Sequence, residues 1–222
     1  MAVEITTYAQ LQTAVERWLD TDETEFTNRA EDFIHLGEVH LNRKLVLREM
    51  KQLATATYAS TNTTRRISLP TGFKRMLTLE AKDASEADVY YQRVTKRPEN
   101  EFANYRTTTG GIPKNYCLRD EIEFDRLVNS NHTIKMLYLK KWDIATDSTN
   151  WLLTNYPDLY LYSALVAAAP FIKDHEALAT YKAMLKEGID EANLEAHKSK
   201  DDTEMDVEQI GNGPGYNIIS DT

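Results

Sequence analysis

Cysteine is nearly absent from this 222-residue sequence, which contains only Cys117. One cysteine forms no intrachain disulfide and cannot build a cysteine-rich metal site. Long hydrophobic runs are also lacking, because the longest apolar stretch, residues 164–169, is far shorter than the roughly 18 residues needed to cross a bilayer. The N-terminal residues have neither the basic nor the apolar region of a secretion signal. We therefore expect a protein without membrane contact, made in a reducing cytoplasm.

Positive charge is in short supply. The 26 Lys and Arg residues are outnumbered by 35 Asp and Glu residues, which gives a formal net charge of -9 and a pI near 5.1. The imbalance lies late in the chain, since residues 1–142 hold 21 basic and 20 acidic residues and residues 143–222 hold 5 and 15. Sequence-independent DNA binding needs a stripe of Lys and Arg that neutralises phosphates. The composition argues against that mode, and an acidic surface holds DNA at a distance.

No pattern of catalytic or metal-binding residues is present. The closest histidine pair, His35 and His40, is spaced i, i+5 on a predicted helix, which separates the imidazoles by about 140° and prevents a shared metal. The GNGPG segment at residues 211–215 follows an acidic stretch rather than a strand, so we expect no phosphate site there. Cys117 is expected to be a packed small side chain rather than a nucleophile. We predict no catalytic residues, no metal and no cofactor.

Two helices are predicted within residues 1–52. In the first, residues 8–19, apolar side chains recur at helical spacing, and Thr7 followed by Gln10 is typical of a capping box. A longer second helix follows the acidic residues 21–25 and carries acids in its first turn and basic residues near its C-terminal end, as the helix dipole favours. A short connection makes the two helices antiparallel, so residues 1–52 are predicted to form a helical hairpin.

The apolar period changes after residue 52, and residues 53–142 are predicted to be an inserted β-rich region. Residues 54–60 and 65–70 are rich in Thr, Tyr and Ile and are expected to pair as a hairpin. A short helix is expected in residues 98–106, because Pro98 suits the first helical position. Further strand-like runs occupy residues 76–83, 88–95, 115–124 and 132–142.

Helical signals return in residues 143–199. Pro157 suits a helix start, and the run that follows is apolar nearly all round, which is typical of a buried helix. Pro170 must kink or end that helix, and Asp174 can cap a last one. The predicted fold class is α+β: a helical bundle of two N-terminal and two C-terminal helices, with an inserted antiparallel β region and an extended C-terminal arm.

Residues 200–222 are predicted to be that flexible C-terminal arm. They have no apolar stripe at helical spacing, contain four Gly or Pro within five residues, and end in an apolar cluster of Tyr216, Ile218 and Ile219. Two interpretations stay open. The segment is either a ragged terminus or an arm that orders on a partner by adding a strand or filling a groove.

Tyrosine is abundant, with 12 residues, and is densest in the segment NWLLTNYPDLYLY at residues 150–162. The aromatic side chains of this segment suit the core, with hydroxyls at its rim, or a subunit interface, where Tyr and Trp supply large and rigid contact area. Both interpretations apply to the same four residues: Trp151, Tyr156, Tyr160 and Tyr162.

Four stretches resemble the head-to-tail adaptor (connector) proteins of short-tailed bacteriophages. They are TYAQLQTAVERWLD, DFIHLGEVHLNRKL, ISLPTGFKRM and TNWLLTNYPDLYLYSALVAAAPFIKD. The last is the most specific, because helix periodicity alone does not explain the order of Asn150, Trp151, Leu152, Leu153, Tyr156, Pro157, Tyr160 and Leu161. The resemblance covers separate blocks within residues 7–186.

The resemblance implies a structural virion protein of the head-tail neck, made in the host cytoplasm. It implies a ring of about twelve copies that joins the portal protein to a tail tube or nozzle protein and lines the DNA channel, through which DNA passes without specific binding. It brings no catalytic or metal residues. On this hypothesis the cluster of Tyr216, Ile218 and Ile219 contacts the portal or a neighbouring subunit.

Two other classes of function stay open. One is a small phage-encoded hydrolase or nucleic-acid enzyme, with a site built from dispersed carboxylates and His132, which would bind a divalent metal or a small ligand. The other is a non-catalytic regulatory binding module, which would form a small stable oligomer independently of a portal.

Overall fold

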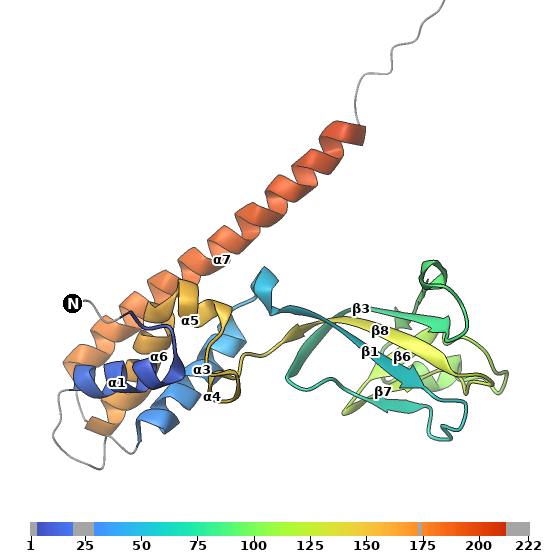
Figure 1. Cartoon of the computed structure of the whole chain (residues 1–222), viewed down its shortest axis with the longest axis horizontal. Helices are drawn as coiled ribbons and strands as arrows, with labels where there is room; N and C mark the ends of the chain where they lie inside the picture. Colours follow the sequence, from blue (N-terminus) through green and yellow to red (C-terminus); the bar gives the residue numbers. More distant parts are fainter. Residues whose placement is uncertain (1–3, 20–28, 173–174, 212–222) are drawn as a thin grey trace, which may run out of the picture. The chain divides into compact units, whose positions relative to one another are not determined.

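The computed structural model describes residues 4–19, 29–172 and 175–211. The chain divides into two compact units. Figure 1 shows the whole chain, with colours that follow the sequence. One unit is formed by Met1–Arg48 with Ile144–Thr222 and is called the helical unit here; the other is Glu49–Asp143 and is called the β unit. Helices and antiparallel sheets are both present, so the predicted α+β class is confirmed.

Helix α6 (Pro157–Ile172) is the central helix of the helical unit (Figure 1). Its side chains are apolar nearly all round, which fits its position, because other helices cover it on several sides. The helices that contact it are α1 (Tyr8–Leu19), α3 (Ala30–Lys44), α5 (Trp151–Asn155) and α7 (His175–Gly211), and the short α4 (Ile144–Asp147) precedes α5. The predicted helix start at Pro157 is confirmed, and Pro170 lies inside α6, two residues before it ends.

The first helix has the predicted bounds, and its N-terminus is the predicted capping box. The Gln10 backbone N–H donates to Thr7 Oγ1 at 3.4 Å, and the Thr7 N–H donates to Gln10 Oε1 at 3.1 Å. These bonds satisfy donors that the first helical turn leaves free. The buried side chains of α1 are Leu11, Val15 and Leu19.

The second helix was predicted to continue to about residue 52, but α3 ends at Lys44. Leu45 is extended, with ψ of 138°, and Leu45 and Leu47 are buried while Val46 is 45% exposed. That alternation belongs to an extended segment, whose successive side chains point to opposite sides. The 3-10 turn η1 (Arg48–Met50) follows, and the first strand begins at Lys51, before residue 53.

The last helix is longer than predicted, because α7 continues to Gly211 instead of ending near residue 199. Residues 200–211 lack an apolar stripe, but between Lys200 and Ile210 they contain no Gly or Pro, the two residues that most disfavour a helix interior. The remainder of the predicted arm, with Tyr216, Ile218 and Ile219, lies outside the described residues, as does Asp174.

The β unit consists of two four-stranded sheets. The first has the order β1-β8-β3-β4, formed by Lys51–Tyr58, His132–Lys140, Phe73–Asp83 and Gln92–Arg93. The second has the order β2-β7-β6-β5, formed by Arg66–Ser68, Glu121–Phe124, Asn115–Leu118 and Thr95–Lys96. Side chains from both sheets meet in one core, where the rings of Tyr58 and Phe124 stack with centroids 4.7 Å apart.

The predicted hairpin of residues 54–60 and 65–70 is wrong, because the two strands belong to different sheets. Strand β1 pairs with β8 and β2 pairs with β7. The turn between them is organised by Asn62, whose Oδ1 accepts from the N–H groups of Thr64 and Arg65 at 2.9 Å each. Arg65 has φ of 62°, a left-handed conformation that redirects the chain to the second sheet.

Three further details of the β unit differ from the sequence prediction. Residues 88–95 do not form one strand, since the 3-10 turn η2 (Asp88–Tyr90) precedes β4 and the two-residue β5. Strand β5 also pairs with β6 in parallel, so the region is not wholly antiparallel. The helix expected at residues 98–106 is present only as the 3-10 turn η3 (Phe102–Tyr105).

Candidate interaction surfaces

The tyrosine-rich segment begins with a capped turn that positions its aromatic side chains. Asn150 is the N-cap of α5, and its Oδ1 accepts from the Leu153 backbone N–H at 2.8 Å. Helix α5 ends at Asn155, and after Tyr156 the chain starts α6 at Pro157. The capping residue and the proline therefore fix two successive helix starts six residues apart, at Trp151 and Pro157.

Tyr160 lies in the core of the helical unit and is fully buried. Its hydroxyl donates to Glu38 Oε1 at 2.7 Å and accepts from Asn150 Nδ2 at 2.7 Å. Glu38, on α3, is itself 5% exposed, and the same oxygen accepts from the Ile144 backbone N–H at 2.9 Å. Burial, with the nearby Glu38 charge, raises the pKa of Tyr160 far above its ordinary value. This network joins α3, α6 and the chain that returns from the β unit.

Trp151 and Tyr156 lie at the surface instead. Trp151 is 39% exposed, and its ring centroid is 5.6 Å from that of Tyr156. The Tyr156 hydroxyl donates to the Glu195 carboxylate on α7. The segment thus contributes both to the core and to an aromatic surface next to α7.

Tyr162 belongs to a second surface, which we call the aromatic patch and define as Trp18, Tyr162 and Tyr181. The Trp18 ring meets those of Tyr162 and Tyr181 edge-on, at centroid distances of 6.2 and 6.4 Å. The three residues come from α1, α6 and α7, and Trp18 is 49% exposed. A half-exposed tryptophan held by two tyrosines is typical of an interface anchor.

A shallow apolar pocket lies between α3 and the end of α6. Phe171 forms one wall, with Phe33 at a ring distance of 5.7 Å and the Arg29 guanidinium 4.7 Å from its ring centroid. Leu36, Ala167 and Pro170 complete the apolar lining. Seven of the nine large hydrophobic side chains exposed in the described part of the chain belong to the helical unit: Trp18, Leu36, Val46, Trp151, Phe171, Met184 and Leu194.

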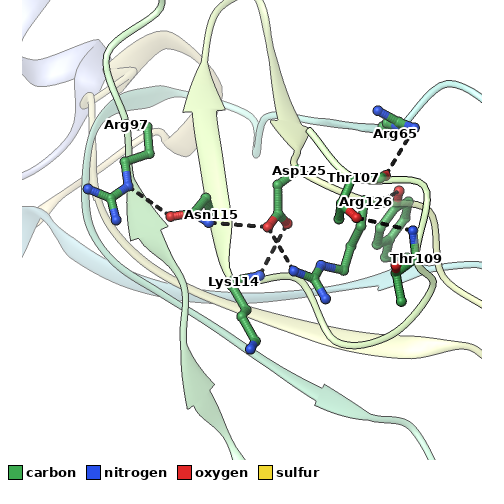
Figure 2. A network of polar contacts seen from close by, with 9 residues as sticks. Arg65, Arg97, Thr107, Thr109, Lys114, Asn115, Asp125 and Arg126 are labelled. Atoms are coloured by element: carbon green, nitrogen blue, oxygen red, sulfur yellow. Dashed lines mark hydrogen bonds and ion pairs between the residues drawn. The ribbon is translucent and has the colours of Figure 1, made fainter. Parts of the chain in front are cut away.

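The β unit contains a buried carboxylate network that the sequence did not reveal. Asp125, 1% exposed, accepts from Asn115 Nδ2 and the Lys114 N–H and pairs with Arg126, each at 3.2 Å (Figure 2). Asn115 Oδ1 in turn accepts from Arg97 Nε at 2.8 Å. These bonds hold the start of β6 against the end of β7.

A second buried carboxylate, Glu123, lies two residues earlier on β7 and is 2% exposed. Arg66 and Arg119 approach it at 3.5 and 3.6 Å, and Arg106 also pairs with it. We call these three residues the arginine cluster. The first and last of them, Arg66 and Arg119, are 53 positions apart in the sequence, so no local motif could have indicated that the three side chains meet.

Charge divides sharply between the two units. The β unit holds 16 basic and 12 acidic residues, a net charge of +4, whereas the rest of the chain holds 10 basic and 23 acidic residues, a net charge of -13. The overall acidity therefore conceals a basic β unit. Residues 1–142 are nearly neutral because they combine the acidic N-terminal helices with the basic β unit, so a division of the sequence at residue 142 does not reveal the difference.

The described residues offer no metal centre. Among them, no three His, Cys, Asp or Glu side chains are grouped so as to hold a metal ion. His132 is buried, with Nδ1 2.8 Å from the Ser130 carbonyl oxygen, whereas His35 and His40 are exposed. Cys117 is 1% exposed, as expected of a packed side chain. No helix in the described ranges is long and apolar enough to span a bilayer.

Exposed aromatic anchors on a helical unit, together with a charged β unit, define a protein whose surfaces are suited to contacts with other proteins. The family model described as SU10 adaptor protein matches residues 6–208, so the chain belongs to that family. It is a phage head-to-tail adaptor, a structural component of the virion. No curated protein matches the sequence.

Proposed function

We propose that this adaptor forms a closed ring of about twelve copies in the neck of a short-tailed phage, between the portal protein and a tail tube or nozzle protein. The observation that carries the proposal is the concentration of exposed aromatic and aliphatic side chains on the helical unit. A lone monomer gains nothing from exposing them, whereas an assembling subunit buries them.

A closed ring needs two different faces on each subunit, because every copy contacts its two neighbours in a head-to-tail manner. The aromatic patch and the apolar pocket around Phe171 are two such surfaces of different shape and composition. The net charge of -13 on the helical unit suits a channel in which DNA slides without being bound, since like charges repel.

The residues beyond α7 supply a further contact in this proposal. Tyr216, Ile218 and Ile219 dock on the portal or on the next subunit, at the end of the long helix. Deleting residues 211–222 should leave a folded protein that binds the portal ring more weakly. Portal binding equal to that of the full chain would contradict this role of the C-terminal residues.

The ring contacts can be tested with surface variants. Trp18→Ala and Phe171→Ala remove side chains that are 49% and 40% exposed, so each variant should fold and yet fill the portal ring incompletely in electron micrographs. Tyr90→Ala, at a 59% exposed position of the β unit, is the matched control and should assemble normally. Normal assembly of all three variants would contradict the assignment of these surfaces.

A further inference from the structure

The arginine cluster is a candidate binding site that the ring proposal does not use. Its side chains are partly open to solvent, with Arg66 45%, Arg106 42% and Arg119 37% exposed, although all three converge on one buried carboxylate. Glu99, which is 66% exposed, is the other acid in contact and pairs with Arg119 at 2.9 Å. Three guanidinium groups thus share two carboxylates, which leaves one positive charge within this set of five side chains.

The guanidinium groups also keep unused hydrogen-bond donors. Each carries five N–H groups, while a carboxylate accepts about four hydrogen bonds. Glu123 Oε2 makes no hydrogen bond within the described part of the chain and has only the two longer ion pairs, to Arg66 and Arg119. The cluster is therefore held in place by a buried anion while its side chains stay partly exposed and keep donors that a second carboxylate can bind.

A surface of complementary charge is present on every copy of this chain, along α7. Glu187, Asp190 and Glu191 are exposed, and with Ala183, Lys186 and Leu194 they line a shallow groove on one face of that helix, where three acids outnumber one lysine. Glu187 and Glu191 are one helical turn apart, a rise of roughly 6 Å. The guanidinium groups of the arginine cluster lie close together, because Arg66 and Arg119 both lie within 3.6 Å of the Glu123 carboxylate. Two acids one helical turn apart can therefore contact two of these groups at once.

We propose that the arginine cluster of one copy binds the acidic face of α7 in the next copy of the ring. The contact rests on the proposed ring and gives it a direction, because the β unit of each subunit then meets the helical unit of its neighbour. Charge complementarity favours this partner, since a unit of net charge +4 meets one of -13. Duplex DNA is the competing anion, and the experiment below distinguishes it from the neighbouring copy.

A charge-swap experiment tests the contact directly. The acid variant is Glu187→Lys/Glu191→Lys, and the arginine variant is Arg66→Glu/Arg106→Glu. The control, Glu86→Lys/Glu101→Lys, changes two exposed acids of the β unit and alters the net charge as the acid variant does. For each full-length protein, the concentration that half-saturates the portal ring is measured at low and at high salt.

Each single-surface variant should need at least tenfold more protein than the wild type, because like charges then face each other at every ring contact. An equal mixture of the acid and arginine variants should restore saturation to within about threefold, since alternating copies bring opposite charges together at each contact. The control should behave like the wild type.

Saturation by the acid variant equal to that of the control would overturn the contact while leaving the ring intact. The acid variant leaves the surroundings of Glu123 unchanged, and the acids it replaces on α7 are exposed. Its result therefore does not depend on whether the arginine variant folds. Loss of duplex DNA binding by the arginine variant, with unchanged assembly, would assign the cluster to nucleic acid instead. Failure of the wild-type chain to saturate the portal would contradict the ring and this contact together.

Discussion

At the scale of single residues, the hydroxyl of Tyr160 has a buried hydrogen-bond partner that the sequence did not indicate. The sequence marked Tyr160 only as one of four aromatic residues suited to core or interface. The structure places it at the centre of a buried network, because Glu38, 122 residues away in the sequence, accepts from its hydroxyl. A glutamate in a predicted helix gives no sign that it is buried, so this partner could not be predicted.

Removal of the Tyr160 hydroxyl should therefore destabilise the helical unit. Tyr160→Phe leaves Asn150 Nδ2 and Glu38 short of a buried partner, which costs about 1–3 kcal/mol of unfolding free energy. Urea unfolding followed by the helical circular dichroism signal measures the loss. Tyr162→Phe, at a half-buried position of α6, is the matched control and should change stability by less than about 0.5 kcal/mol. Equal unfolding free energies of the two variants would mean that the hydrogen bonds of the Tyr160 hydroxyl do not stabilise the helical unit.

The chain's single thiol reports on the other buried carboxylate. Cys117 is directly opposite Glu123 in the β6–β7 ladder and is 1% exposed. Glu123→Gln removes the charge that holds Arg66, Arg106 and Arg119, so local opening should become easier and Cys117 should react with a thiol reagent at least tenfold faster. Glu99→Gln, at a 66% exposed position, should react at about the wild-type rate. Unchanged reactivity of the Glu123 variant would mean that the arginines do not stabilise this sheet.

At the scale of elements, the helical unit depends on two close helix contacts that glycine permits. A Cβ at Gly37 on α3 would lie 2.6 Å from Ser163 Oγ and 2.8 Å from the Ala164 backbone nitrogen on α6. A Cβ at Gly188 on α7 would meet the Leu159 Cδ2 methyl at 2.7 Å, the end of a flexible side chain. Backbone cannot move aside as a methyl group can, so the two glycines differ in what they require.

Alanine substitution should separate these two cases. Gly37→Ala should lower the unfolding free energy by about 1–3 kcal/mol, because overpacking against the α6 backbone exceeds the helix propensity gained. Gly188→Ala should be within about 1 kcal/mol of the wild type, since Leu159 can rotate and the alanine favours the helix. Thermal unfolding of the two variants side by side provides the measurement. A Gly37→Ala protein as stable as Gly188→Ala would contradict the close α3–α6 approach.

The elements also show where the sequence is informative. Helix α1 was predicted with the right bounds because a capping box and an apolar stripe both mark it. Strand β8 was predicted because residues 133–138 have clear β character, and its side chains alternate in burial along most of the strand. The hairpin of residues 54–60 and 65–70 failed because strand pairing is a tertiary property: the two strands enter different sheets after a left-handed Arg65. Such a redirection leaves no periodic signal.

At the scale of the whole molecule, the charge division between the units is the feature that composition hides. The chain's net charge of -9 argued against DNA binding, and that argument applies to the helical unit. The β unit has a net charge of +4, and its three clustered arginines are brought together only by the fold. The family could be inferred from ordered motifs in the sequence, whereas the surfaces that serve it depend on which side chains remain exposed after folding.

The measurement that tests the account most directly is the molar mass of the purified adaptor by light scattering, alone and mixed with the portal ring of the same phage. The account predicts a 25.5 kDa monomer alone and an added mass of about 300 kDa on the portal, the mass of about twelve subunits. A stable dimer that leaves the mass of the portal unchanged would contradict the ring.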